Sequence, residues 1–143
     1  MGKYFGTDGF RGEANVGLTV DHAVKIGRFL GHAFGKKHKA RIVIGKDTRL
    51  SSYMLEDALA AGITASGASV GFITRTERFD CGVMISASHN PYYDNGIKII
   101  SGSGEKMDEA FTDEIENYLD GAYGEIPYAT REHIGKTIDY YGG

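Results

Sequence analysis

Four side chains that could do chemistry together lie within one short stretch of the sequence. Ser86 and Ser88 follow the apolar residues 83–85, His89 comes directly after Ser88, and Lys98 lies in a second apolar run. A serine hydroxyl becomes a nucleophile when a neighbouring group takes its proton, and a lysine adds positive charge. Loops between strand-like runs commonly hold functional groups. The stretch therefore predicts a nucleophilic serine at the end of a strand.

The same residues also fit two other interpretations. Asn90 and Pro91, and the Asp-Asn-Gly sequence at residues 94–96, are ordinary turn signals, so turn chemistry alone is also compatible with a purely structural hairpin. A serine hydrolase predicts Gly-x-Ser-x-Gly at a strand-to-helix elbow. Ser86 and Asn90 occupy the two glycine positions around Ser88, so the hydrolase pattern fails here.

The ordered string around Ser88 is more specific than a turn. Ser-Ala-Ser-His-Asn-Pro at residues 86–91, followed by Asp-Asn-Gly-Ile-Lys at residues 94–98, resembles the phosphoserine loop of the α-D-phosphohexomutases. The resemblance implies that Ser88 carries a transferable phosphoryl group. It also implies that His89 and Lys98 act beside that group.

Two further strings resemble segments of the same family. Gly-Thr-Asp-Gly-Phe-Arg-Gly at residues 6–12 is similar to the family's N-terminal signature, in which Arg11 reaches the active site and binds phosphoryl oxygens. Gly-Lys-Asp-Thr-Arg at residues 45–49 is similar to a segment near the catalytic loop. Read physically, Arg49 could bind an anion beside a helix N-terminus, or it could pair with Asp47 at the surface. The candidate catalytic residues are Ser88, His89, Lys98 and Arg11, and the candidate substrate- or phosphate-binding residues are Arg11, Asp47, Arg49, Asn90 and Lys98.

The resemblance also implies a metal and further domains. In this family Mg²⁺ binds an oxygen of the serine phosphate, here on Ser88, and the aspartates of an Asp-Gly-Asp-Gly-Asp-Arg loop. No such loop occurs in the 143 residues. The chain therefore corresponds to the first domain of a phosphohexomutase, and we expect it to be inactive without the remaining domains. A hexosamine or glucose 1,6-bisphosphate is the expected activator, and the family allows a homodimer.

The expected substrate is a sugar phosphate. The serine before Ala87 and the aspartate at position 8 favour the branch of the family that interconverts glucosamine 6-phosphate and glucosamine 1-phosphate. The alternatives are a phosphoglucomutase or phosphomannomutase, and a non-catalytic module that binds sugar phosphates. The loop that recognises the sugar would separate these branches, and it belongs to a later domain.

Composition narrows the classes of partner and compartment. A net charge of −3 gives no electrostatic case for nucleic acid or an anionic membrane as partner. No apolar stretch is long enough to span a bilayer, and no signal peptide is present, so the expected location is the cytoplasm. The single cysteine, Cys81, lies among apolar residues and is expected to be a buried, unreactive thiol.

Hydrophobic periodicity and turn signals predict an α/β domain, with three α/β/α layers and a mixed sheet as the family implies. Residues 1–17 read as a short apolar segment and a flexible polar loop. Thr19 is the expected cap of the first helix, and Ser51 or Ser52 that of the second. The expected helices span residues 18–35, about 52–67 and 107–119, and the expected strands span residues 41–45, 68–71, 80–85 and 96–100. Residues 1–120 would form the domain, and residues 121–143 a connecting segment.

The chain departs from the family between its third and fourth expected strands. The family pattern has a longer strand, a loop containing Thr-Pro and a short helix before the segment at residues 74–80. Here residues 70–73 pass directly into that segment. A piece of roughly a dozen residues is therefore missing relative to the usual connection.

Overall fold

The structure is a computed structural model that describes residues 3–35, 40–72 and 79–138. In these ranges the chain forms three α-helices, one short 3-10 helix and six strands. In order along the chain, the elements are β1 (Phe10–Glu13), α1 (Val20–Phe34), β2 (Arg41–Lys46), α2 (Leu50–Ala65), β3 (Ser69–Phe72), β4 (Cys81–Ile85), β5 (Asp94–Ser101), α3 (Glu109–Leu119), η1 (Arg131–His133) and β6 (Thr137–Ile138).

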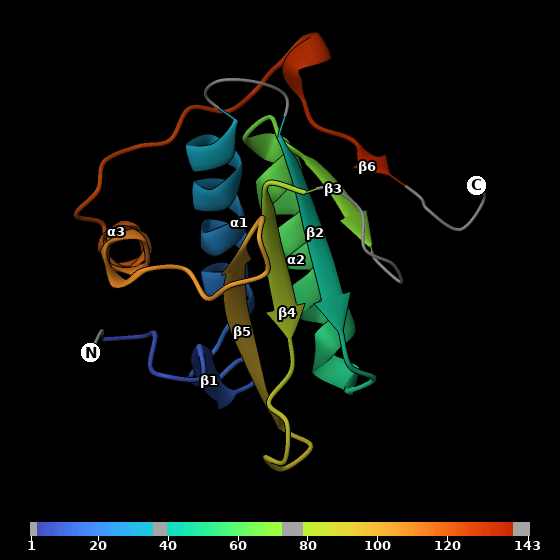
Figure 1. Cartoon of the computed structure of the whole chain (residues 1–143), viewed down its shortest axis with the longest axis vertical. Coiled ribbons are helices and arrows are strands. Elements are labelled where there is room, and N and C mark those ends of the chain that lie inside the picture. Colours follow the sequence, from blue (N-terminus) through green and yellow to red (C-terminus); the bar gives the residue numbers. More distant parts are fainter. Residues whose placement is uncertain (1–2, 36–39, 73–78, 139–143) are drawn as a thin grey trace.

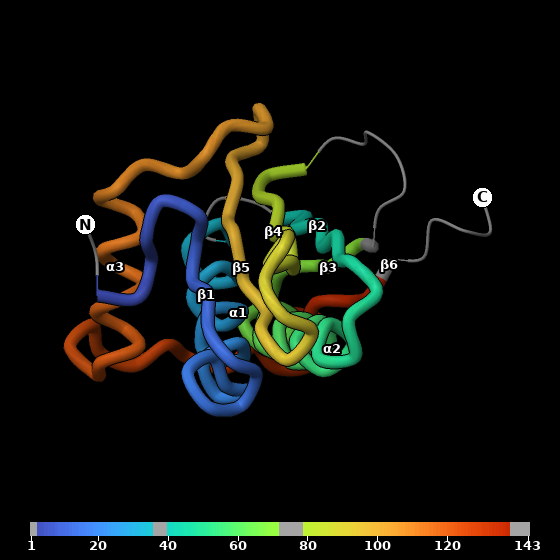
Figure 2. Tube along the Cα trace, turned by 90° about the horizontal axis from the view of Figure 1, so that it is seen from below, coloured from blue at the N-terminus to red at the C-terminus, as the bar shows by residue number. Residues whose placement is uncertain are grey.

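The strands form one mixed sheet in the order β1-β5-β4-β2-β3-β6. The β4, β2, β3 and β6 strands run parallel, whereas β5 is antiparallel to both β4 and β1. Helices α1 and α2 lie side by side on one face of the sheet, and α3 lies at the side where β1 is (Figures 1 and 2). The predicted α/β fold with a mixed sheet is confirmed.

The alternating pattern of β4 explains how the sheet meets the helices. Cys81, Val83 and Ile85 are buried and belong to the main hydrophobic core, whereas Met84 is 45% exposed on the opposite face. A strand with one buried and one exposed face is stabilised mainly by removing the apolar side chains of the buried face from water. Burial also raises the pKa of the Cys81 thiol to about 12, as expected for an unreactive cysteine.

The two predicted helix caps had different outcomes. Thr19 caps α1 as expected: its side chain accepts from the backbone N–H of His22, and the His22 ring accepts from the Thr19 N–H. The cap predicted for α2 is wrong. Arg49 occupies the N-cap position without a side-chain cap, and Ser51 and Ser52 lie inside the first turn. Likewise α3 begins at Glu109, two residues later than predicted, because Asp108 caps it through the Phe111 N–H.

The N-terminal segment is not wholly the flexible loop that its composition predicted. Residues 10–13 form the edge strand β1, in register with residues 94–97 of β5. Glu116 of α3 anchors the preceding segment, because its carboxylate accepts the backbone N–H groups of Lys3, Tyr4 and Phe5 at 3.1, 2.7 and 2.7 Å.

The described part of the predicted connecting segment packs against the domain. The guanidinium of Arg28, which is 5% exposed, donates to the carbonyls of Ile126 and Pro127 and to the Ser66 hydroxyl. Farther along, β6 pairs with β3 through Val70 and Thr137. The segment therefore adds a sixth strand to the sheet. No helix in the described ranges is long and apolar enough to cross a membrane.

Candidate functional site

The candidate site lies at the end of the sheet where the parallel strands β2 and β4 finish. The loop from β4 to β5, residues 86–93, is at the lower end of the sheet in Figure 1, beside the start of α2. The Asp47 N–H donates to the Ile85 carbonyl at 3.1 Å, so the loop after β2 is tied to the end of β4. This is the edge at which α/β sheets usually bind ligands.

Ser88 lies exposed at the tip of this loop in an unusual backbone conformation. Its φ angle is +55°, in the left-handed region that non-glycine residues rarely adopt. The Asn90 N–H donates to the Ala87 carbonyl at 3.0 Å, which closes a tight turn with Ser88 as its first central residue. His89 does not have a positive φ, so the turn has the sign pattern of a II′ turn, which favours glycine at the Ser88 position. A serine kept in a strained position fits a functional residue.

Arg11 of β1 reaches this loop by crossing the neighbouring strand. Arg11 pairs with Gly96 of β5, so both face the same side of the sheet. A Cβ atom at position 96 would lie only 3.0 Å from Arg11 Cγ, so the absence of a side chain there leaves room for Arg11. Its Nη1 atom then makes a long contact of 3.5 Å with Asn90 Oδ1. The structure therefore brings together Arg11 and Asn90, two of the residues that the sequence suggested as phosphate ligands.

Lys98 shares the Arg11 face of the sheet. It lies two residues beyond Gly96 on β5, pairs with Met84, and has an exposed side chain. His89 is also exposed, next to Ser88. Within the described ranges no hydrogen bond joins the side chains of Lys98 or His89 to Ser88. The arrangement is a hydroxyl with cationic side chains on the adjacent face of the sheet and open access from solvent.

The carboxylate of Asp47 is hydrogen-bonded to neighbouring groups of this chain. Its carboxylate accepts from the Arg49 N–H at 3.1 Å, from Arg49 Nε at 2.9 Å and from the Ser52 hydroxyl at 2.6 Å. Partial burial acts to raise the pKa of Asp47, but the hydrogen bonds from Ser52, Arg49 and Ser86 outweigh it and hold the pKa below its ordinary value. Asp47 is therefore a charged partner of Arg49, which is the pairing that the sequence left open, and its role in binding substrate stays a prediction.

Arg49 is directed at the backbone of the loop. Nη1 donates to the carbonyls of Asn90, Pro91 and Asp94 at 3.1, 2.9 and 3.1 Å, and Nη2 donates to the Ser88 carbonyl at 2.5 Å. Sequence reasoning had placed a phosphate in this position. Most N–H groups of this guanidinium therefore donate to carbonyl oxygens of the chain itself.

Sequence reasoning missed two buried polar residues behind the loop. Asn95 is fully buried, and its Nδ2 donates to the hydroxyls of Ser51 and Ser52 at 2.9 and 3.0 Å. Ser52 is also fully buried and donates to Asp47. The network thus links the start of β5 to the start of α2. The asparagine of the Asp-Asn-Gly string was the available signal, but it read as a turn residue.

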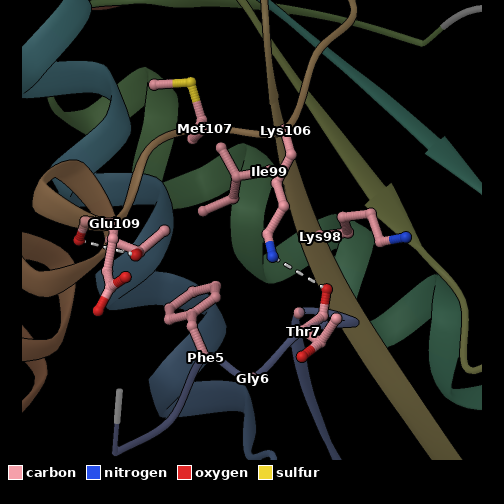
Figure 3. A pocket seen from close by; sticks show the side chains of 10 residues that line it. Phe5, Gly6, Thr7, Lys98, Ile99, Lys106, Met107 and Glu109 are labelled. Atoms are coloured by element: carbon pink, nitrogen blue, oxygen red, sulfur yellow. Dashed lines mark hydrogen bonds between the residues drawn. The ribbon is translucent and has the colours of Figure 1, made fainter. Parts of the chain in front are cut away.

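A cavity of about 510 Å³ lies beside the candidate site, on the side of the N-terminal segment. It is lined by residues of segment 5–9, of β5, of the stretch before α3 and of the first turn of α3, and they include Phe5, Met107 and the candidate catalytic residue Lys98. Lys106 Nζ donates to the Thr7 carbonyl at 3.1 Å across this space, and Figure 3 shows the Lys98 amino group turned away from that bond. The cavity contains no residue of the serine loop.

The described residues do not form a metal site by themselves. In the ranges that the structure covers, no cluster of three or more His, Cys, Asp or Glu side chains could hold a metal ion. Asp47, the carboxylate tied to the serine loop through Arg49, is occupied by Arg49 and Ser52. A phosphate on Ser88 could supply one hard oxygen ligand of the kind that Mg²⁺ prefers, and the described residues offer no carboxylate cluster to add to it.

Comparisons with known proteins agree with this fold. The chain matches the family model described as "Phosphoglucomutase/phosphomannomutase, alpha/beta/alpha domain I" over residues 2–123. It is 67% identical over 157 aligned positions to the phosphoglucosamine mutase of Lachnospira eligens, and 60% identical over 154 positions to that of Lachnoclostridium phytofermentans. Both alignments cover 100% of this chain but only 35% and 34% of those proteins, so the chain spans about a third of their length.

Solved structures show the same fold at low sequence identity. A phosphoglucomutase/phosphomannomutase family protein from Burkholderia thailandensis matches with a TM-score of 0.76 at 22% identity, over 96% of this chain and 32% of that chain. The open form of parafusin, a phosphoglucomutase from Paramecium, matches with a TM-score of 0.54 at 22% identity, over 82% of this chain and 25% of that chain.

The alignments also bear on the shortened connection after β3. The comparison with the Lachnospira eligens protein spans 157 positions for the 143 residues of this chain, so at least 14 positions of that relative have no counterpart here. This agrees in size with the predicted absence. Its expected place adjoins residues 73–78, which lie outside the described residues, so the location remains a prediction.

Proposed function

Because this chain belongs to the phosphohexomutase family as its domain I, we propose that it supplies the phosphoserine of an enzyme that interconverts glucosamine 6-phosphate and glucosamine 1-phosphate. The observation that carries the proposal is the placement of Ser88. Its hydroxyl is exposed at the tip of a strained turn, and Arg11 crosses Gly96 to reach the same loop. The named activity of the 67% and 60% identical relatives supports the choice of sugar.

The proposed reaction passes one phosphoryl group through Ser88. The sugar's free hydroxyl attacks the phosphorus of phosphoserine 88, the bond from phosphorus to Ser88 Oγ breaks, and a sugar bisphosphate and a free serine result. Ser88 Oγ then attacks the other phosphate of the bisphosphate, which releases the isomeric monophosphate and restores phosphoserine. Within each half the attacking hydroxyl loses one proton and the leaving oxygen gains one, so protons and phosphoryl groups balance.

The residues of this chain would stabilise charge and move the proton in these steps. Negative charge spreads over the equatorial oxygens of the transferred group, so guanidinium and ammonium groups lower the barrier. Arg11 would bind phosphoryl oxygens, and Lys98 would supply positive charge and exchange the proton at Ser88 Oγ or the sugar hydroxyl. His89 is a second candidate for that proton. Mg²⁺, when bound to the phosphate with ligands from other domains, would add charge neutralisation of the same kind.

The chain alone should not turn over substrate. It spans about a third of its relatives' length, and it does not complete a metal site in the described ranges. The proposal therefore includes further domains that supply the carboxylates and the sugar-recognition loop, a hexose bisphosphate as activator, and a cytoplasmic location. Whether the active form is a homodimer is left to a measurement of mass in solution.

Phosphoryl transfer to Ser88 can be tested on the chain directly. Incubation with glucose 1,6-bisphosphate and Mg²⁺, followed by intact mass and peptide mapping, should add one phosphoryl group to the peptide that contains Ser88. The gain should disappear in Ser88→Ala and persist in Ser103→Ala, which removes another exposed serine. A phosphoryl group that still appears in Ser88→Ala would place the carrier elsewhere.

Turnover and sugar choice need the missing domains. A chimera in which this chain replaces the matching third of the Lachnospira eligens protein should interconvert the two glucosamine phosphates, and its Ser88→Ala variant should not. The chimera takes its sugar-recognition loop from the relative, so it tests whether this chain supports turnover. A chimera that folds but does not interconvert the two glucosamine phosphates, while the unchanged relative does, would overturn the proposed role of this chain.

A further inference from the structure

We propose that Arg49 is a positioning residue that holds Ser88 in its left-handed conformation, and that it is not a phosphate ligand. The inference deepens the proposed function, because it identifies the group that presents the phosphoryl carrier. The contacts that support it involve only residues of this chain.

The guanidinium is itself fixed before it meets the loop. Arg49 occupies the N-cap position of α2, its N–H and Nε both donate to Asp47, and its side chain is 13% exposed. Asp47 in turn accepts from the buried Ser52 hydroxyl at 2.6 Å, and its backbone N–H is bound to the end of β4. Because the Asp47 carboxylate binds both the backbone N–H and Nε of the same arginine, the guanidinium has little freedom left to follow a mobile ligand.

The contacts to Ser88 explain why its unusual conformation persists. The Ser88 carbonyl accepts from Arg49 Nη2, and the Ser88 N–H donates to the Ser86 hydroxyl at 3.1 Å. Both peptide groups next to the Ser88 Cα are therefore held, one on each side, while φ is +55°. Strained backbone of this kind persists only where surrounding contacts over-determine it.

The remaining contacts close the loop around the same cation. Nη1 donates to the carbonyls of Asn90, Pro91 and Asp94, and the Pro91 carbonyl also accepts the Asp94 N–H at 3.0 Å. One guanidinium thus holds the backbone of a loop that lies 39 to 45 positions farther along the sequence. Asn95, bound to Ser51 and Ser52, fixes the point where the loop enters β5.

The same contacts argue against Arg49 as a phosphate ligand. Its donors face carbonyl oxygens, and the Asp47 carboxylate at 2.9 Å balances its charge. An approaching phosphate would meet oxygen atoms on most sides of the guanidinium. Arg11 and Lys98, whose side chains are exposed, remain as the cations for the phosphoryl group.

The first test uses the whole, unphosphorylated chain, so it does not depend on phosphoryl transfer. In Arg49→Lys, one ammonium replaces a fork that serves several carbonyls, so the NMR signature of positive φ at Ser88, a strong intraresidue amide–Hα cross-peak, should weaken. Amide exchange at Asn90 should accelerate on the order of tenfold beyond the change in global stability. Arg28→Lys is the matched control, since Arg28 is another buried guanidinium that binds carbonyls, but those of residues 126 and 127. It should leave both loop signals unchanged.

The outcomes are decisive in both directions. If Arg49→Lys keeps the Ser88 cross-peak and the Asn90 protection, the positioning role is wrong. If Arg28→Lys loses the same signals, they report only general destabilisation, and the proposal also fails. Should Arg49→Lys not fold, Asp47→Asn keeps the guanidinium but removes the charge that orients it, and it should produce the same local loss.

A second test rests on the proposed function. In the phosphoryl-uptake assay with glucose 1,6-bisphosphate, Arg49→Lys should lower the maximal rate while the half-saturating concentration stays within roughly twofold, whereas Arg11→Lys should raise that concentration. A rise in Arg49→Lys matching that in Arg11→Lys would restore Arg49 as a phosphate ligand. If even the unchanged chain takes up no phosphoryl group, the proposed function is at fault, and the NMR and exchange results still decide the role of Arg49.

Discussion

The backbone strain at Ser88 gives a sharp prediction on stability. Replacing Ser88 by glycine should stabilise the chain relative to replacing it by alanine, although both changes remove the hydroxyl. The reason is the φ angle of +55°, which glycine adopts freely and alanine does not. At most positions the order is reversed, because glycine loses more chain entropy on folding.

The expected size follows from two opposing effects. A left-handed conformation costs a residue with a Cβ atom about 1–2 kcal/mol. Glycine costs about 0.5–1 kcal/mol in additional entropy of the unfolded chain. The difference leaves Ser88→Gly more stable than Ser88→Ala by about 0.5–1 kcal/mol. For a chain of this size that corresponds to a melting temperature roughly 2–4 °C higher.

The assay compares urea unfolding of four variants. Ser103 provides the control, because it is an exposed serine in a described turn whose φ is not positive. There the order should invert, with Ser103→Ala more stable than Ser103→Gly by about 0.5–1 kcal/mol. If Ser88→Gly is no more stable than Ser88→Ala while the Ser103 pair behaves as expected, the turn is not strained and the reasoning about Ser88 is wrong.

Three further predictions concern residues away from the loop. Glu116→Gln should destabilise the chain by about 2–3 kcal/mol in urea unfolding, because one buried carboxylate accepts three backbone N–H groups; an unchanged midpoint would contradict this. Burial, assisted by Lys25, lowers the pKa of His22 below its ordinary 6.5, so stability should be full above about pH 6.5 and fall as pH drops below it. That fall should be shallower in His22→Gln. Cys81, with a pKa of about 12, should resist iodoacetamide at pH 8 until the chain is unfolded; labelling of the folded chain would refute its burial.

Local patterns predicted most of the fold. The alternation of Cys81, Val83 and Ile85 with Gly82 and Met84 is a property of the strand itself, and the Thr19 cap depends on residues only three positions apart. The exposure of Ser88 followed from a polar turn between two apolar runs. Such features depend on residues that are neighbours in the sequence, so they can be predicted from the amino-acid sequence alone.

The errors arose where distant residues decide. Residues 10–13 read as loop because glycines surround them, yet β5 supplies the partner that makes them a strand. Ser52 read as a helix cap because its type favours that position, but the distant Asn95 and the nearby Asp47 use its hydroxyl instead. The contacts of Arg49 with the serine loop were also not predictable, because its acceptors are backbone carbonyl groups, which every residue has. The types of the residues in the sequence therefore do not indicate which carbonyl groups the arginine binds.

The missing side chain at position 96 has a consequence for sequence variation. A Cβ atom there would come within 2.7 Å of the Ser86 carbonyl and 3.0 Å of Arg11 Cγ. The first of these atoms belongs to the backbone, so an alanine would have to shift the start of the serine loop as well as the arginine. Among proteins that share the string, a glycine here therefore marks those whose loop and arginine can take up this arrangement together.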